Sequence, residues 1–426
     1  MPRNFIKNEK VREIAHIDMN NFFASVECML DVNLKDKAVA VCGSVEERHG
    51  IVLAKNYIAK RYGVQTGEPV WRAKQRCRDL VIVPPHYDEY IKYSHLAKCI
   101  YDNYTDRIEP YGIDECWVDL THSTKLFGSS ESICNEIRQR IKDELRLTVS
   151  IGLSFNKVFA KLGSDMKKPD ALTVIPFDSF REKIWKLPVS DLLGVGRKTN
   201  ELLFKYGINT IGDLAQIDVE QLVSRLKSHA YQIHSWANGL DYSEVTHKDY
   251  IIDVKSVSHG TTTKEDLTNN SGVWLVILWL CQKVSHKLIA YKKKAAEVGI
   301  SVKDNTLYLK QWQRKLNMPT LCALTIAKAI FALFLKSYDW CNNIRAITVY
   351  TFDLIEDKIP FQIDFFNDVT IVDKHERISI VIDKIREKFG NDIIKNACLY
   401  QKSPNIKLTN ESVAKSFLPT GLSTMK

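Results

Sequence analysis

Apolar residues recur with two different periods over the first 175 positions of the chain. Short apolar runs with the length of β-strands occupy residues 14–17, 38–42, 107–113, 116–120 and 149–153. Apolar residues at helical spacing occupy residues 20–30, 54–62, 131–145 and 156–166. Asn20 offers a helix start signal, and Gly63 and Pro169 mark helix ends. This alternation predicts an α/β unit over residues 13–175.

The pattern changes twice in the rest of the chain. Residues 177–242 read as wholly helical with short glycine-containing turns, and the polar residues 243–250 read as a linker. Residues 251–352 then follow the order strand, helix (272–291), two strands, helix (321–338), strand (344–352), which predicts a β-α-β-β-α-β ferredoxin-like module. The tail from residue 354 holds one amphipathic helix over residues 374–389 and a polar end expected to be disordered.

Composition narrows the class of protein. A chain of 426 residues predicts three or four folded units, and 45% apolar with 26% charged residues is typical of a soluble globular protein. The net charge of +9 suggests an anionic partner, for which nucleic acid and a merely solvated basic surface are both open. The ten cysteines form no C-x-x-C pair, which argues against zinc and for a reduced cytoplasmic protein. The longest apolar run, residues 273–281, is shorter than a bilayer span of about 20 residues, so we expect no membrane association.

Three acidic residues carry the candidate chemistry. Asp18 ends the first predicted strand, and Asp114 and Glu115 stand side by side between two others. If these strands are neighbours, three carboxylates converge and would hold two Mg²⁺ ions for phosphoryl transfer, because hard oxygen ligands favour Mg²⁺ over zinc. By type and spacing alone, a helix cap at Asp18 and a solvated turn at Asp114 and Glu115 explain the pattern better than a metal site.

Lysines follow in a third segment, residues 154–169. Lys157, Lys161 and Lys168 lie in or just beyond a predicted helix, where their ammonium groups could reach nucleotide phosphates. For Lys157 and Lys161 taken alone, an exposed basic helix face is the simpler interpretation.

The three segments, in this order, resemble the signatures of the Y-family DNA polymerases, the DNA polymerase IV and UmuC-like group. The likeness covers about residues 13–352. It implies an α/β multidomain right-hand polymerase with a ferredoxin-like palm (residues 1–27 and 87–175), small fingers (28–86) and a helical thumb (176–242). A linker (243–253), a β-α-β-β-α-β little finger (254–356) and a tail (357–426) would follow.

The resemblance also implies roles for single residues. Asp18, Asp114, Glu115 and the backbone carbonyl of Met19 would bind two Mg²⁺ ions, with Mn²⁺ as a substitute, and Asp114 and Glu115 would be catalytic. Phe23 matches the steric gate that excludes ribonucleotides, whereas Phe22 is compatible with a core position. Residues matching the triphosphate-binding positions are Tyr57, Lys60 and Lys168.

The chain departs from the family pattern at several positions. Lys60 stands where members often have Arg, and Gly112 stands where they usually have Ser. Ile51, Leu53 and Ala54 are closer to the UmuC pattern and put the lesion range in doubt.

Two further motifs predict partners. Gly194, Gly196, Arg197 and Lys198 resemble a helix-hairpin-helix turn, whose amide groups would bind the phosphates of primer–template DNA without reading sequence. The segment Gln362, Ile363, Asp364, Phe365, Phe366 resembles the peptide by which bacterial polymerases dock on the sliding clamp.

The function expected from these residues is low-fidelity, template-directed DNA synthesis across lesions, adding dNTPs to a primer 3′ end without proofreading. We expect a monomeric, nucleoid-associated enzyme of the cytoplasm. The alternatives are a catalytically weak accessory DNA-binding protein that recruits repair factors, and a non-enzymatic DNA-binding module or structure-specific nuclease built on the Gly194–Gly196 turn.

Overall fold

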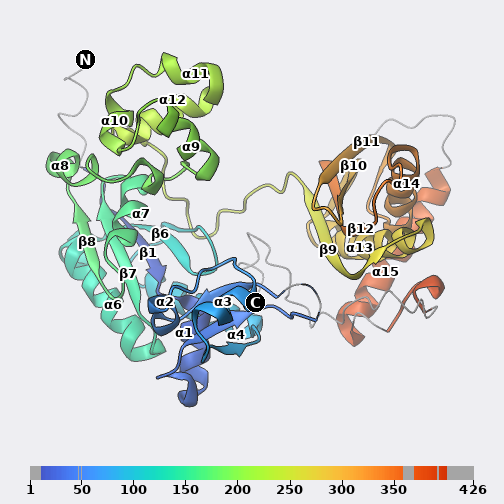
Figure 1. Ribbon diagram of the computed structural model, residues 1–426, viewed down its shortest axis with the longest axis horizontal. Helices are drawn as coiled ribbons and strands as arrows, with labels where there is room; N and C mark the ends of the chain where they lie inside the picture. Colours follow the sequence, from blue (N-terminus) through green and yellow to red (C-terminus); the bar gives the residue numbers. More distant parts are fainter. Residues whose placement is uncertain (1–10, 47, 49, 358–368, 391–392, 401–426) are drawn as a thin grey trace. The chain divides into compact units, whose positions relative to one another are not determined.

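The computed structural model describes residues 11–46, 48, 50–357, 369–390 and 393–400 (Figure 1). The described residues divide into two compact units: residues 11–43 and 51–251 form the first, and the chain from Ile252, together with Ser44–Gly50, forms the second. Each unit has its own hydrophobic core and is described by itself.

A five-stranded sheet forms the centre of the first unit. Its order is β5-β6-β1-β7-β8, with β5 (Ile108–Pro110), β6 (Glu115–Asp119), β1 (Ile14–Met19), β7 (Val149–Ser154) and β8 (Leu172–Ile175). The middle strand β1 is antiparallel to both β6 and β7, and all six of its residues are buried. Strand β1 is therefore packed on both faces, and successive side chains point to opposite faces of the sheet.

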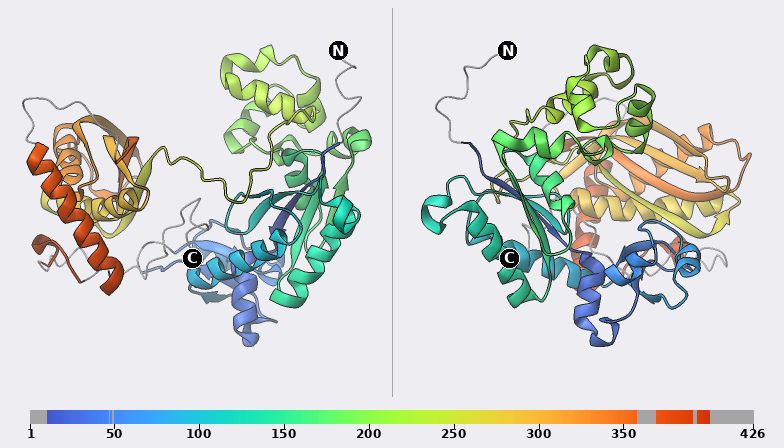
Figure 2. Two further views of the ribbon diagram at one scale, coloured as in Figure 1. Left: turned by 180° about the vertical axis from the view of Figure 1, so that it is seen from behind. Right: turned by 60° about the vertical axis from the view of Figure 1, so that its left-hand side comes forward.

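Helices cover both faces of this sheet, and the two faces differ in polarity. Helices α4 (Tyr87–Asp102) and α6 (Ser130–Leu145) pack on the face of Ala15 and Ile17, which is apolar (Figure 2). Helix α7 (Lys157–Met166) packs on the other face, the face of His16 and Asp18. Polar residues of β1 therefore all point toward α7.

Glycine at position 152 allows α7 to approach the sheet closely. A Cβ atom there would lie 2.0 Å from the carbonyl oxygen of Ala160 and 2.4 Å from the amide nitrogen of Ser164, distances that no side chain tolerates. Asn156 begins the helix, because its side chain accepts a hydrogen bond from the Phe159 amide at 2.8 Å. Strands β7 and β8 are parallel, so β7-α7-β8 forms a βαβ unit beside β1.

A small α/β segment interrupts the unit between β1 and α4. It begins with α1 (Phe22–Leu30) and the short helix η1 (Val32–Leu34), and its sheet has the order β3-β2-β4. The remaining elements are β2 (Val39–Cys42), β3 (Val52–Lys55), α2 (Tyr57–Arg61), α3 (Val70–Arg76) and β4 (Val81–Val83). Their core consists of small residues such as Ala40 and Ala59, which suits a segment of this size.

The last part of the first unit is helical. Helix α5 (Thr124–Phe127) follows the sheet strand β6. After β8 come η2 (Phe177–Ser179), α8 (Phe180–Ile184), η3 (Val189–Asp191), α9 (Arg197–Lys205), α10 (Ile211–Gln216), α11 (Glu220–Leu226) and α12 (Ser228–Ala237). A capping box between Thr210 and Asp213 starts α10.

The stretch expected to be a linker is anchored over part of its length. Arg12 donates to the carbonyl oxygens of Asp241 at 2.7 Å and Ser243 at 2.8 Å, and Lys248 pairs with Asp102 at 2.6 Å. Val245 is buried against the sheet. Residues 241–248 therefore lie fixed on the first unit although they form no helix or strand.

The second unit contains a four-stranded antiparallel sheet of order β11-β10-β12-β9. Its elements are β9 (Val257–Leu267), α13 (Asn270–Ala290), β10 (Lys293–Asp304), β11 (Leu309–Thr320), α14 (Ala323–Ser337) and β12 (Ile344–Glu356). This element order confirms the predicted β-α-β-β-α-β module. Each long helix links two parallel strands that have a third strand between them, and Figure 1 shows both helices beside the sheet.

Helix α13 is long and apolar enough, by composition, to cross a membrane. In the structure it is the core helix of the second unit, with Val276, Leu280 and Val284 fully buried. Its apolar composition is explained by this packing.

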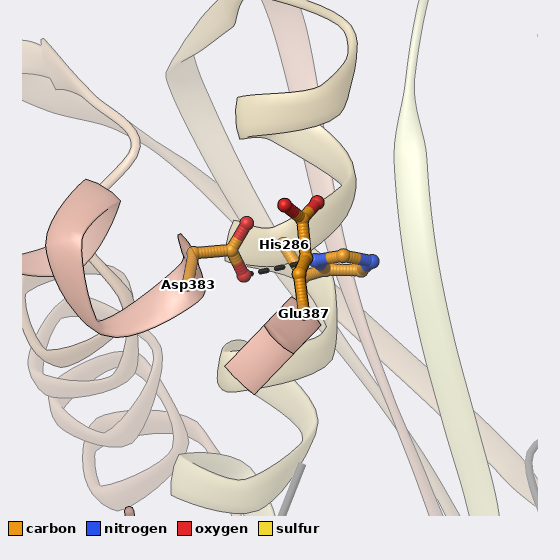
Figure 3. Close-up of side chains that lie close together, drawn as sticks. All are labelled: His286, Asp383 and Glu387. Atoms are coloured by element: carbon orange, nitrogen blue, oxygen red, sulfur yellow. Dashed lines mark hydrogen bonds and ion pairs between the residues drawn. The ribbon is translucent and has the colours of Figure 1, made fainter. Parts of the chain in front are cut away.

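A further helix, α15 (Val369–Phe389), packs on α13, and the short helix η4 (Ala397–Tyr400) follows it. Figure 3 shows the contact: His286 Nδ1 of α13 lies 2.8 Å from Asp383 Oδ1, and Glu387 lies one turn further along α15. Arg386 also donates to Gln282 at 3.0 Å. The hydrogen bond to Asp383 raises the pKa of His286, and Glu387 adds to the effect while burial and Lys283 oppose it.

Several predicted elements differ from the observed ones. The predicted helix over residues 54–62 begins only at Tyr57, because Val52–Lys55 pairs with β2 as strand β3. Helix α1 begins at Phe22, because Asn21 adopts a left-handed conformation with φ 48°. Helix α4 was not predicted, and β12 continues to Glu356. The tail end expected to be disordered, residues 401–426, lies outside the described residues.

We predict that the attachment of α15 weakens as the pH rises. Since the folded-state pKa of His286 is raised above 6.5, its stabilisation is complete below about pH 6.5 and is lost as the pH rises through the folded-state value. Hydrogen exchange of α15 amides, corrected for intrinsic rates, should therefore speed up with pH. His286→Gln should remove this dependence, whereas His375→Gln on the same helix should retain it; a flat wild-type profile would contradict the prediction.

Candidate active site

Strand pairing brings the three predicted carboxylates together. Asp18 and Glu115 are direct partners in the antiparallel pairing of β1 with β6, and the Met19 amide donates to the Asp114 carbonyl at 3.0 Å. Asp18, at 6% exposure, is buried, while Asp114 and Glu115 are half-buried. The alternative of two separate features, a helix cap and a solvated turn, is therefore wrong: Asp18 caps no helix, and all three carboxylates share one corner of the sheet.

Mutual repulsion and burial perturb these carboxylates. Burial raises the pKa of Asp18 to about 6, although Lys168 opposes the shift, and Glu115 and Asp114 add to it. Burial, followed by the charge of Glu115, also raises the pKa of Asp114. Burial acts in the same direction on Glu115, but His16 and Lys161 outweigh it and lower its pKa to about 2. The corner thus holds more negative charge than its lysines neutralise.

Lysines from α7 and the loop after it meet these carboxylates. Lys168 Nζ lies 2.8 Å from Asp18 Oδ2 and 2.9 Å from Asp165, and Lys161 Nζ lies 2.5 Å from Glu115 Oε2. Lys157 instead pairs with Glu109 at 2.8 Å. The interpretation of Lys157 and Lys161 as an exposed basic face is therefore wrong, because both are half-buried in ion pairs.

A buried histidine stands behind Glu115. His16 is fully buried, with Nε2 3.4 Å from Glu115 Oε2 and Nδ1 2.8 Å from Ser164 Oγ. Burial lowers the pKa of His16, so the ring is neutral at physiological pH. The ring and Lys161 together fix the carboxylate of Glu115 from two sides.

The donor set fits divalent cations with hard-ligand preference. Asp18, Asp114 and Glu115 supply six carboxylate oxygens, and the Met19 carbonyl is adjacent in the chain. Burial is the main cause of the raised pKa values of Asp18 and Asp114, and a bound divalent cation would stabilise their charged forms. The His16 ring is engaged with Ser164 through Nδ1, while its buried Nε2, 3.4 Å from Glu115 Oε2, has no hydrogen-bond partner among the described residues.

Aromatic residues of α1 and α4 pack together around Phe23. Phe22 is buried in the core, as expected, whereas Phe23 is half-buried and stacks on Tyr90 at 4.2 Å between ring centroids. Tyr87 packs edge-on against the same ring at 6.0 Å. The Tyr90 hydroxyl donates to Glu27, so the support behind Phe23 is itself held in place.

The predicted triphosphate-binding residues differ in how they relate to the carboxylates. Burial raises the pKa of Tyr57, and the charges of Lys168 and Asp18 act on it as well, which places its hydroxyl in the electrostatic field of the carboxylates. Lys60 is exposed, 5.8 Å from the Tyr57 ring one turn along α2. Lys168 therefore contacts a carboxylate of the corner directly, whereas Lys60 is exposed on α2.

The glycine turn occurs in the helical part of the first unit. Gly194 adopts φ +87° and Gly196 precedes α9, whose first residues are Arg197 and Lys198. All four residues are exposed, and the helix start points free amides outward. The predicted clamp peptide, Gln362, Ile363, Asp364, Phe365 and Phe366, lies outside the described residues.

Some residues of the site were missed from sequence. His16 and Ser164 were not singled out, although an alternating pattern in β1 that puts His16 on the face of Asp18 was a usable signal. Ser94 and Lys98 of α4 were missed because α4 itself was not predicted. No local pattern reports contacts between elements this far apart in sequence.

Comparisons with known proteins identify the family of the chain. The impB/mucB/samB family matches at residues 17–165, its C-terminal domain at residues 254–365 and its HHH motif at residues 178–208. DNA polymerase IV of Acetivibrio thermocellus is 48% identical over 92% of this chain and 98% of its own length. DNA polymerase IV 1 of Bacillus subtilis is 34% identical over 96% of this chain and 98% of its own length.

A solved structure shares the fold. The Y-family DNA polymerase chimera Dbh-Dpo4(243-245)-Dbh matches with a TM-score of 0.70 and 22% identity, covering 81% of this chain and 99% of the chimera. The structural match confirms the multidomain fold, and the extent and identity of the sequence matches settle the family. The chain belongs to the impB/mucB/samB family, and thus to the Y-family DNA polymerases of the DNA polymerase IV and UmuC-like group.

Proposed function

We propose that this protein extends a DNA primer on a template by nucleotidyl transfer at the corner formed by Asp18, Asp114 and Glu115. The chain is a translesion DNA polymerase by family, and relatives that it covers almost completely are named DNA polymerase IV. The pairing of Asp18 with Glu115 carries the assignment of the active site, because it joins carboxylates from segments about 100 residues apart. The accessory-protein alternative is not favoured.

The proposed metal ligands are Asp18, Asp114, Glu115 and the Met19 carbonyl. Two Mg²⁺ ions bound there would neutralise charge on the phosphates and on the primer 3′ oxygen, and Mn²⁺ is expected to substitute. Hydrogen-bonded His16 and ion-paired Lys161 hold Glu115 in place. Because the relatives' names say nothing of the metal, the support for Mg²⁺ is the all-oxygen donor set.

Lys168, Tyr57 and Lys60 are proposed to bind the triphosphate of the incoming dNTP. Lys168 now pairs with Asp18, so a triphosphate would offer its ammonium a second anion within reach. Lys60 is a point charge, without the paired donors of Arg, and the exposed end of its side chain suits the outermost phosphate. Phe23 is proposed as the steric gate, since its ring is partly exposed and braced by Tyr90 and Tyr87.

We assign the domains as the sequence suggested. The five-stranded sheet with α4, α6 and α7 would be the palm, the β3-β2-β4 segment the fingers and α8–α12 the thumb. The second unit would be the little finger and the tail. The turn of Gly194, Gly196, Arg197 and Lys198 would bind DNA phosphates through its backbone amides, because all four residues are exposed at a helix start.

A sliding clamp is the proposed partner besides DNA and dNTP. The peptide from Gln362 to Phe366, with its paired aromatic anchors, is proposed to dock on a sliding clamp. We propose a monomeric enzyme that acts in the cytoplasm on nucleoid DNA.

The first test removes a proposed metal ligand. Asp114→Asn keeps the shape of the side chain but removes a charge that binds the cation, so primer extension should fall by about a thousandfold or more. Single-nucleotide extension at saturating Mg²⁺ measures this loss. Asp119→Asn, at the far end of β6 and with its carboxylate accepting from the Thr121 amide, should extend normally. Full activity of Asp114→Asn would exclude this corner as the active site.

The second test concerns sugar discrimination. Phe23→Ala should open space beneath the sugar and raise ribonucleotide incorporation by about a hundredfold or more, the order expected when a steric clash worth roughly 3 kcal/mol is removed. The ratio of kcat/KM for dNTP and rNTP measures it. Phe22→Leu, at the buried neighbouring position, should leave the ratio unchanged. Unaltered discrimination by Phe23→Ala would place the gate elsewhere.

The third test concerns the clamp. Replacing Phe365 and Phe366 by Ala should abolish stimulation by the sliding clamp, because the apolar anchors are lost, and should leave basal extension intact. Phe389→Ala, an exposed phenylalanine at the end of α15, is the matched control. Clamp stimulation that survives the double substitution would reject this docking peptide.

A further inference from the structure

Two polar residues on the apolar side of the sheet contact the turn that carries Asp114. Ser94 of α4 is almost fully buried, at 1% exposure, and its hydroxyl donates to the carbonyl oxygen of Ile113. Ile113 directly precedes Asp114. Of the residues of α4, the proposed chemistry uses only Tyr87 and Tyr90, which brace Phe23, so the buried contact of Ser94 requires its own explanation.

Lys98 lies one helical turn further along α4 and contacts Ser94. Its Nζ donates to Ser94 Oγ at 3.1 Å. Among the residues that the structure describes, no carboxylate lies within 4.0 Å of this ammonium group. Burial lowers the pKa of Lys98, and the charge of Asp114 is near enough to oppose the shift. A half-buried lysine without an ion pair is costly, which favours a specific task.

The hydrogen bonds of this pair can run in one direction only. An ammonium group has donors and no acceptor, so Lys98 occupies a lone pair of Ser94 Oγ. The single hydroxyl hydrogen of Ser94 is then left for the Ile113 carbonyl. Hydrogen bonds in such a chain strengthen one another in a low-dielectric interior. Lys98 therefore orients Ser94, and Ser94 orients the peptide group between Ile113 and Asp114.

Backbone hydrogen bonds also hold the turn. The Met19 amide donates to the Asp114 carbonyl at 3.0 Å, and the Tyr111 amide donates to the Glu115 carbonyl at 3.0 Å. Gly112 supplies no side chain, and a Cβ atom there would make only an ordinary 3.5 Å contact with Asp114 Oδ1. Glycine also leaves the backbone freer than any other residue would. A side-chain anchor from α4 compensates for this freedom.

We propose that Ser94 and Lys98 are positioning residues that act in series on the Ile113–Asp114 turn and hold the Asp114 carboxylate in register with Asp18 and Glu115 for metal binding. The proposal rests on the proposed polymerase function. Loss of Ser94 should therefore impair Mg²⁺-dependent primer extension more than it lowers the melting temperature.

The experiment measures single-nucleotide primer extension as a function of Mg²⁺ concentration, together with the melting temperature, for full-length variants. Ser94→Ala should lower kcat about tenfold or more and raise the half-saturating Mg²⁺ concentration several-fold, since small misplacements of a reacting group have effects of this size. Ser94→Thr keeps the hydroxyl and should restore most of both values. Lys98→Met should also lower kcat.

Two matched controls separate positioning from general destabilisation. Ser123 is also buried, and its hydroxyl donates to the Tyr104 carbonyl at 2.7 Å, so Ser123→Ala loses the same kind of bond elsewhere. Lys92→Met removes a lysine from the exposed side of α4. Both controls should keep the wild-type Mg²⁺ dependence at equal or greater loss of melting temperature.

The double variant tests the serial arrangement. If Lys98 acts through Ser94, then Ser94→Ala with Lys98→Met should lose no more activity than the worse single variant. Losses that multiply, an unchanged Mg²⁺ dependence of Ser94→Ala, or an equal effect of Ser123→Ala would each overturn the proposal. If Ser94→Ala does not fold, Ser94→Cys and Lys98→Met decide by the same criteria. Wild-type protein that fails to extend primers at all would instead refute the proposed function.

Discussion

Electrostatic repulsion among Asp18, Asp114 and Glu115 is the constraint around which the first unit is organised. The register of β1 against β6 places these carboxylates together at one corner, and burial keeps water from screening them. Lys168 and Lys161 oppose the repulsion, while burial, followed by the neighbouring carboxylates, raises the pKa values of Asp18 and Asp114. The proposed divalent cations would add positive charge at this corner.

The two faces of the sheet contribute to this corner in different ways. Helix α7 approaches closely over Gly152 and brings Lys161 and Ser164 to the face of Asp18. Helix α4, on the apolar face, reaches the turn before Asp114 through Ser94. Positive charge therefore comes from one side and backbone support from the other. The carboxylates need both, because charge alone would not fix their direction.

Much of the fold could be predicted because its elements are strongly periodic. The strands at β1, β6 and β7 and the helices α6, α7 and α13 were found from the spacing of apolar residues. Prediction failed where another force dominated: Val52–Lys55 became a strand because it pairs with β2, and α1 starts late because Asn21 turns left-handed. Helix α4 was not predicted, because its mean hydropathy is low and its apolar stripe is interrupted by Ser94 and Lys98.

The sequence by itself determined which residues are candidates: Asp18, Asp114, Glu115, Phe23 and Lys168 follow from motif and resemblance. Tertiary structure alone decided how they meet. The Asp18–Glu115 pairing depends on a register set by burial of β1 on both faces, and the pairing of Lys161 with Glu115 depends on how closely α7 approaches. Spacing along a chain reports local geometry, whereas contact between distant segments is a property of the packed core, which no single segment contains.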